Sequence, residues 1–112
     1  MPFENLEVWK RAKELSVSIY RSMANLKDFG FKDQITRSSL SIPSNIAEGM
    51  ERSTEKEKAR FLEIARGSAA ELRTQIMIEI EYINKETGEQ WLKETKEISA
   101  MLVGLARSLK SK

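Results

Sequence analysis

The chain of 112 residues contains no cysteine and no histidine. Without cysteine there is no disulfide, no thiolate metal site and no cysteine nucleophile, which fits a cytoplasmic protein. Without histidine there is no histidine-dependent catalytic triad, no ordinary zinc site and no Glu-x-x-His di-iron site. These absences exclude the commonest catalytic and metal centres, so we expect no cofactor and no metal ion.

The sequence also lacks the patterns of membrane insertion and of phosphate-binding loops. No window approaches the roughly 20 uncharged apolar residues of a membrane span, and the first residues lack the order of a signal peptide. The five glycines are scattered, and none follows a predicted strand. Ser41 and Ser44 have no neighbouring base in the sequence. We therefore expect a non-enzymatic protein with no membrane partner and no small-molecule substrate.

What the sequence does contain is amphipathic helix, in a chain that is 40% hydrophobic and 32% charged. Apolar residues recur at intervals of three and four in four segments. Each segment begins with a residue that can cap a helix. The predicted helices run from about 5 to 27, 33 to 52, 54 to 85 and 87 onward, with caps at Asn5, Asp33, Thr54 and Thr87. Because the connections are short, the pattern predicts an all-α, antiparallel up-down-up-down four-helix bundle, with residues 1–112 as one domain.

The first break between helices is predicted around residues 28–31. Gly30 can take the left-handed conformation that stops a helix. Phe29 and Phe31, on either side of it, are expected to close the end of the core.

The second predicted helix contains the run Ser-Ile-Pro-Ser-Asn-Ile-Ala-Glu-Gly at residues 41–49. Pro43 has no amide hydrogen and clashes with the carbonyl four residues back, so we expect a kinked helix. The simpler interpretation is a core helix whose polar residues satisfy their own backbone, with Glu48 hydrogen-bonded to Asn45 or paired with Arg52. The alternative is a subunit contact or ligand surface displayed at the kink.

The third predicted helix carries small residues in its first half and apolar residues outside its main stripe. The stripe is Phe61, Ala65, Ser68, Ala69, Leu72, Ile76, Ile80 and Ile83. Gly67 costs about 1 kcal/mol of helix propensity relative to alanine, so we expect it to pack closely against the kinked helix. The candidate contact residues are Pro43, Asn45, Glu48, Gly49, Gly67 and Ser68.

A second apolar face remains on the third predicted helix, made of Leu62, Ile64, Met77, Ile78 and Tyr82. Either this helix is central in its own bundle or the face packs on another subunit; the pattern favours a homo-oligomer.

Basic residues recur near one side of the same helix. Arg52, Arg66 and Arg73 fall at heptad-equivalent positions, and Lys56 and Arg60 lie close to that line. Arginines along one face can contact successive phosphates of a nucleic acid. The alternative is a solvated face balanced by acidic residues, since the net charge is only +2. The cations of the C-terminus, including Arg107 and Lys110, suit the helix dipole or form a basic tail.

Three blocks carry a resemblance to a known family. They are residues 3–10 (Phe-Glu-Asn-Leu-Glu-Val-Trp-Lys), residues 41–49, and residues 61–72 (Phe-Leu-Glu-Ile-Ala-Arg-Gly-Ser-Ala-Ala-Glu-Leu). In this order they resemble the bacterial four-helix-bundle family named for 23S rRNA intervening sequences. Related members include the accessory protein of diversity-generating retroelements, a basic pentamer that works with RNA and a reverse transcriptase. The resemblance implies a homopentamer and, as partner, structured RNA or a ribonucleoprotein.

Two hypotheses from different classes follow. The first is a ring-forming helical scaffold that binds structured RNA or an RNA-protein complex through its basic face. The second is an oligomeric protein-interaction scaffold whose charges only keep it in solution.

Overall fold

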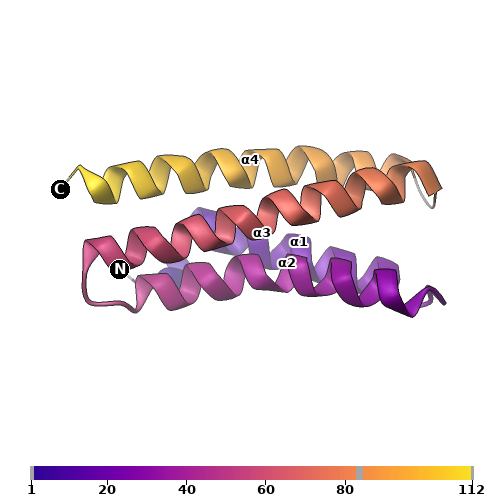
Figure 1. The fold of residues 1–112 in the computed structure, drawn as a ribbon, viewed down its shortest axis with the longest axis horizontal. Coiled ribbons are helices and arrows are strands. Elements are labelled where there is room, and N and C mark those ends of the chain that lie inside the picture. Colours follow the sequence, from indigo (N-terminus) through magenta and orange to yellow (C-terminus); the bar gives the residue numbers. More distant parts are fainter. Residues whose placement is uncertain (1, 83–84, 112) are drawn as a thin grey trace.

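The computed structural model describes residues 2–82 and 85–111, which form four α-helices and no strand (Figure 1). After a short 3-10 turn, η1 (Phe3–Asn5), come α1 (Glu7–Met23), α2 (Phe29–Met50), α3 (Glu55–Tyr82) and α4 (Lys85–Lys110). The predicted all-α class and four-helix bundle are confirmed. In Figure 1 the beginning of α1 and the end of α4 lie at the same end of the bundle. No helix of the described segments is long and apolar enough to cross a membrane.

The start of α1 differs from the expected cap at Asn5. Asn5 belongs to η1, and its amide donates to the Pro2 carbonyl (3.1 Å). The next amide, that of Leu6, donates to Phe3 (2.9 Å), so a tight turn occupies the residues expected to open the helix. The helix begins only at Glu7, without a side-chain cap, and ends at Met23 rather than near residue 27.

The break between α1 and α2 lies earlier than expected, at residues 24–28. Asp28, not Asp33, caps α2, and its carboxylate accepts the Phe31 amide at 3.2 Å. Gly30 therefore lies inside the first turn of α2, and no described glycine has a positive φ, so the predicted left-handed stop is wrong. Phe29 is 71% exposed and does not close the core, whereas Phe31 packs against it. Asp28 comes first after the break, so the helix starts there.

The cap predicted for α3 is confirmed, and the one predicted for α4 is wrong. Thr54 Oγ1 accepts the Glu57 amide at 3.1 Å. Because α4 already begins at Lys85, Thr87 lies within the helix instead of before it. Gly88, expected to belong to a helix start, is buried beside Ile80 of α3. The predicted stripe residue Ile83 lies outside the described residues.

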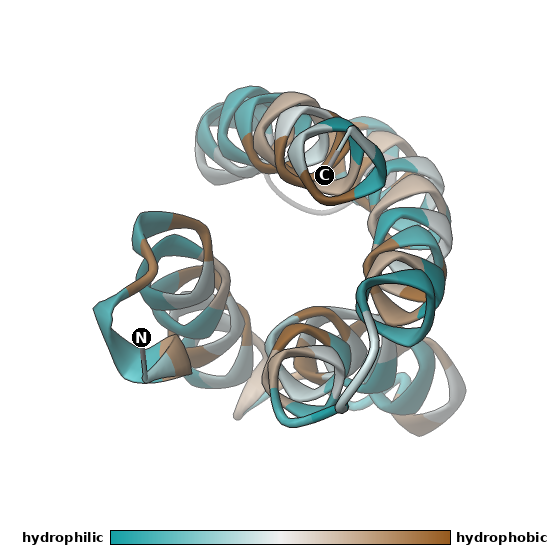
Figure 2. Cartoon of the chain, turned by 90° about the vertical axis from the view of Figure 1, so that its left-hand side faces the viewer, coloured by the Kyte–Doolittle hydropathy of each residue, from teal (hydrophilic) through white to brown (hydrophobic). Residues whose placement is uncertain are grey.

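The core is made by one apolar side of each helix. Figure 2, which views the helices end-on, shows them along an arc in the order α1, α2, α3, α4, so that α2 and α3 each have two neighbours. The largest fully buried aliphatic side chains are Ile19, Ile35, Ile42, Ile46, Leu62, Leu72, Ile76, Ile98 and Leu102. Leu62, which the sequence suggested for a second apolar face, is only 1% exposed and belongs to this core.

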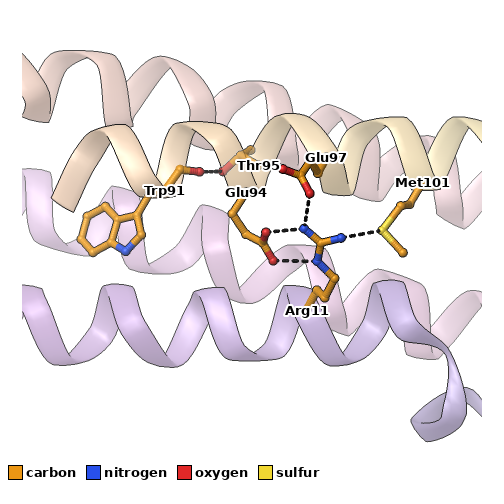
Figure 3. Close-up of polar contacts among 6 residues, drawn as sticks. All are labelled: Arg11, Trp91, Glu94, Thr95, Glu97 and Met101. Carbon is orange, nitrogen blue, oxygen red and sulfur yellow. Dashed lines mark hydrogen bonds and ion pairs between the residues drawn. The ribbon is translucent and has the colours of Figure 1, made fainter. Parts of the chain in front are cut away.

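Long polar side chains join α1 to α4 across the two ends of this arc. The guanidinium of Arg11 donates to Glu94 (Nε to Oε2, 2.9 Å) and to Glu97 (2.7 Å), and it also reaches the sulfur of Met101 (Figure 3). The hydrogen bonds to the two carboxylates raise the pKa of Arg11, and the bond to Glu94 has the larger effect. The guanidinium in turn lowers the pKa of Glu97. One turn before Glu94 on α4, the indole N–H of Trp91 donates to Ser18 Oγ of α1 (3.0 Å).

Candidate nucleic-acid interface

An open groove runs along the surface between α3 and α4. Its first part, of about 760 Å³, lies between the beginning of α3 and the end of α4. Its second part, of about 400 Å³, lies along the middle of both helices, and Glu63 lines both parts. We call this the α3–α4 groove. Its basic residues are Lys56, Arg60, Arg66, Arg73 and Lys110.

Small residues line the second part of the groove. Gly67 and Ala70 come from α3, and Ser99, Ala100 and Val103 come from α4. These short side chains carry no charge and cover little of the helix surfaces. The charge of this part of the groove therefore comes from its longer side chains, Glu63, Arg66 and Arg73. Arg66 and Arg73 lie seven residues apart, which places them about two helical turns apart on the same side of α3.

Two of the five cations are already paired within α3. Arg60 contacts Glu57 (2.9 Å) and Arg66 contacts Glu63 (2.8 Å). These hydrogen bonds lower the pKa values of both carboxyl groups, so both acids stay ionised and offset the arginines. Within the described ranges no carboxylate forms an ion pair with Lys56, Arg73 or Lys110. These three are the cations of the groove that are available to an outside anion.

Arg52 lies apart from this line. It belongs to the connection before α3, so it is not on the long helix as expected. Its guanidinium lies 4.7 Å from the centre of the Phe61 ring, and that of Arg60 lies 4.8 Å from the same ring. Arg52 also pairs with Glu48 at 2.9 Å, which confirms one of the two interactions expected for Glu48. Phe61 thus brings Arg52 close to Arg60 at one end of the groove.

The structure therefore gathers four of the predicted basic residues in one groove and places the fifth beside its end. Lys110 is a groove residue that the sequence did not assign to this face. In the sequence it belongs only to the cations of the C-terminus, because its proximity to α3 depends on how α4 packs. Its charge helps to lower the pKa of Glu63, after the hydrogen bond from Arg66.

Two of the predicted contact residues, Pro43 and Asn45, lie in the middle of α2. Pro43 is buried inside a helix that remains α-helical on both sides of it. The side-chain amide of Asn45 donates to the carbonyl (2.8 Å) and the hydroxyl (2.9 Å) of Ser41, and that hydroxyl lies 2.8 Å from the Ser68 hydroxyl. Asn45 thus hydrogen-bonds the backbone of its own helix, as the simpler interpretation of the run expected. The contact between Ser41 and Ser68 links α2 to α3.

The close approach of backbones occurs at Gly49 and not at Gly67. A Cβ placed on Gly49 would lie 2.7 Å from the Cβ of Phe61 and 3.3 Å from the Lys58 carbonyl oxygen. A Cβ on Gly67 would meet no described atom within 4 Å. The predicted packing of Gly67 against α2 is wrong because this position points away from α2, toward the α3–α4 groove.

The side of α3 that borders α2 combines hydroxyl contacts with exposed isoleucines. Ser38 Oγ donates to Glu71 Oε1 (2.8 Å), which places Glu71 beside α2. Ile64 and Ile78 lie one heptad before and after Glu71 and are both exposed. Met77 is exposed too, so three of the predicted second-face residues, Ile64, Met77 and Ile78, do lie on the surface.

The carboxyl group of Glu79 is buried, and no described cation forms an ion pair with it. Glu79 of α3 is 1% exposed, and its Oε2 has no hydrogen-bond partner within the described part of the chain. Burial raises the pKa of this carboxyl group. A Cβ on Gly88 of α4 would lie 3.3 Å from Oε2, so the carboxylate faces the close contact between α3 and α4. No group of three or more acidic side chains suited to a metal ion occurs in residues 2–82 and 85–111.

Comparison with known proteins identifies relatives of the whole fold. The sequence profile of the family described as 23S rRNA-intervening sequence protein matches residues 4–104. A crystal structure of a protein of unknown function from the S23 ribosomal protein family of Bacteroides thetaiotaomicron is similar, with a TM-score of 0.82 and 28% sequence identity. The alignment covers 88% of this chain and 97% of that one. No curated protein matches the chain.

Proposed function

The chain belongs to the family of 23S rRNA-intervening sequence proteins, and on this premise we propose that it is a non-enzymatic, cytoplasmic scaffold that binds structured RNA. In this proposal the single-domain subunit is an antiparallel bundle, bent at Pro43, and several copies form a closed ring, a pentamer by resemblance. The RNA binds through the α3–α4 groove, with Arg52 at its end.

The observation that carries the proposal is the set of unpaired cations in the groove. Lys56, Arg73 and Lys110 come from both helices and line one surface. A cation without a carboxylate partner can neutralise a phosphate without first breaking an ion pair. Contacts of this kind carry affinity and little base information, so we expect weak sequence preference.

The ring increases the effect of this modest charge. Each subunit contributes three unpaired cations, and a closed assembly repeats them around one surface. An extended RNA that reaches several subunits then gains from each contact without any new interaction. This explains how a chain with a net charge of only +2 can bind a polyanion.

Fluorescence anisotropy with a labelled RNA hairpin at several salt concentrations tests the proposal. Affinity should fall with salt, with a log–log slope of about −0.7 to −0.9 per phosphate neutralised. The double variant Arg73→Glu/Lys110→Glu should bind more weakly and lower the magnitude of the slope by about 2.

The matched control changes the same amount of charge elsewhere. Lys27 and Lys93 are exposed and line neither part of the groove. Lys27→Glu/Lys93→Glu should therefore keep most of the salt slope. Equal losses in the two double variants would move the site away from the groove. No binding by the wild type at low salt would instead favour the protein-interaction scaffold, which the exposed isoleucines of α3 also suit.

A further inference from the structure

A second surface depression lies between α1 and α2, on the other side of α2 from α3. It has a volume of about 290 Å³, and its apolar lining is formed mainly by Val17 and Tyr20 of α1 and Leu40 and Pro43 of α2. We call it the α1–α2 groove. Tyr20 and Leu40 are 45% and 48% exposed, although both are large apolar side chains. An exposed apolar groove of this kind is typical of an interaction site.

The charges at the edge of the α1–α2 groove have one sign. Its charged lining residues are Lys13 and Arg21. Lys13 is paired only with its exposed neighbour Glu14, at 3.7 Å. Arg21 forms no ion pair with any described residue. The groove therefore fits an apolar helix face that carries a carboxylate.

The same chain has a face of that description on α3. Ile64, Glu71 and Ile78 follow one another at heptad spacing and form what we call the α3 stripe. Both isoleucines are exposed. Glu71 accepts a hydrogen bond from Ser38 but forms no ion pair with any described cation. Each isoleucine is about 10 Å from Glu71 along the helix axis.

We propose that the α3 stripe of one subunit docks in the α1–α2 groove of a second copy of this chain. An isoleucine then lies between Leu40 and Val17 of the neighbour, and Glu71 faces a cation at the edge of the groove. The contact covers apolar side chains that water otherwise surrounds. It also pairs Glu71 with Arg21, neither of which forms an ion pair with another described residue.

This contact is heterologous, because the two surfaces are different parts of the chain. When two copies pair, one keeps its groove free and the other keeps its stripe free. Further copies can therefore add, and the contact closes into a ring if the rotation between subunits permits it. Figure 2 shows α2 between α1 and α3, so the two surfaces lie on either side of α2. They do not overlap the α3–α4 groove. The inference rests on the oligomer of the proposed function and specifies which surfaces build it.

Size-exclusion chromatography with light scattering tests the contact through four single variants. Leu40→Glu should disrupt the groove and Ile78→Glu the stripe, and each should yield monomers where the wild type is an oligomer. Met77→Glu is the control for the stripe, because Met77 and Ile78 are both 47% exposed and lie on different sides of α3. Phe29→Glu is the control for the groove. Both controls should remain oligomeric, and circular dichroism should show unchanged helix content in all four.

Mixing the two monomeric variants distinguishes this arrangement from a symmetric one. Leu40→Glu retains an intact stripe and Ile78→Glu an intact groove, so an equal mixture should form heterodimers with one good contact. A contact between two stripes or between two grooves gives no such complementation, and a mixture that stays monomeric overturns the proposal. In a second test, Glu71→Arg should weaken the oligomer and Arg21→Glu should restore it.

The outcomes for assembly and for RNA are separate. A wild-type monomer at micromolar concentration overturns the contact, as do disruptive variants that remain oligomeric. An oligomer that behaves as predicted here but does not bind RNA supports the contact and rejects only the RNA-binding function.

Discussion

The two ends of α3 differ from its middle in how closely neighbouring helices approach. At its beginning, Gly49 of α2 lies against Phe61, and at its end, Gly88 of α4 lies against Ile80. In the middle, Gly67 faces open space in the lining of the α3–α4 groove. Glycine thus has two roles in one bundle: at the ends it permits contact between helices, and in the middle it leaves the surface of the α3–α4 groove uncovered.

The largest expected effect is at the beginning of α3. Gly49→Ala places a methyl group 2.7 Å from Phe61 Cβ and 3.3 Å from the Lys58 carbonyl. Both atoms belong to or adjoin the backbone of α3, so the helices must separate. We expect a loss of about 1–3 kcal/mol in the free energy of unfolding, measured by urea denaturation at fixed protein concentration. A variant as stable as the wild type would show that α2 and α3 have room to spare here.

The other end of α3 should tolerate the same change better. Gly88→Ala brings Cβ against Ile80 Cγ1, and a side chain can move where a backbone cannot. We expect a loss of about 1–2 kcal/mol. The companion change Ile80→Ala removes Cγ1, the atom that the new methyl group meets. In a double-mutant cycle, Gly88→Ala should therefore cost less in the Ile80→Ala background than in the wild type. An equal cost in both backgrounds would show that relief of the clash is not the limiting factor.

Glu79, the buried acid near the end of α3, should make the stability of the protein depend on pH. The folded-state pKa of Glu79 is raised by burial, so its ionisation lowers stability as pH rises from the unfolded value, about 4.3, through the folded value. Glu79→Met removes this contribution. The variant should gain about 1 kcal/mol over the wild type at neutral pH, and the gain should shrink as the pH falls toward 4. Thermal melts at several pH values measure it, and a gain independent of pH would contradict the assignment.

The smallest effect is expected in the middle, with the opposite sign. Gly67→Ala meets no described atom within 4 Å and improves helix propensity, so it should stabilise the monomer by about 0.5–1 kcal/mol. The same denaturation experiment, run beside Gly49→Ala, compares the two glycines directly. Destabilisation by Gly67→Ala would indicate that a neighbouring subunit approaches this position.

The sequence was sufficient for the class of fold and for the basic groove residues of α3. The 3.6-residue period identified four helices, and heptad spacing identified Arg66 and Arg73 as neighbours. Helix starts were less predictable, because Asp28 and Asp33 are equally good caps and the sequence pattern does not show which of them the chain uses. A glycine in a helix likewise looks the same whether it contacts a neighbour, as Gly49 does, or faces solvent, as Gly67 does.

Contacts between distant segments could not be inferred from local patterns. Lys110 joins the α3–α4 groove only because the end of α4 lies beside the beginning of α3. Arg52 approaches Arg60 because both guanidiniums lie against the Phe61 ring. Spacing along one helix gives the face of a residue, but the partner across the groove depends on the packing of two helices.

The hydrogen bond between Trp91 and Ser18 makes the contact of α1 with α4 optically observable. Trp91 is 4% exposed and lies at this contact, whereas Trp9 is half-buried near the N-terminus. A Trp9→Phe variant therefore contains a single indole, whose emission reports whether α1 is seated on α4. Detachment of α1 admits water to the ring and shifts the emission to longer wavelength, so stopped-flow fluorescence can time the docking of the first helix separately from the formation of the other three.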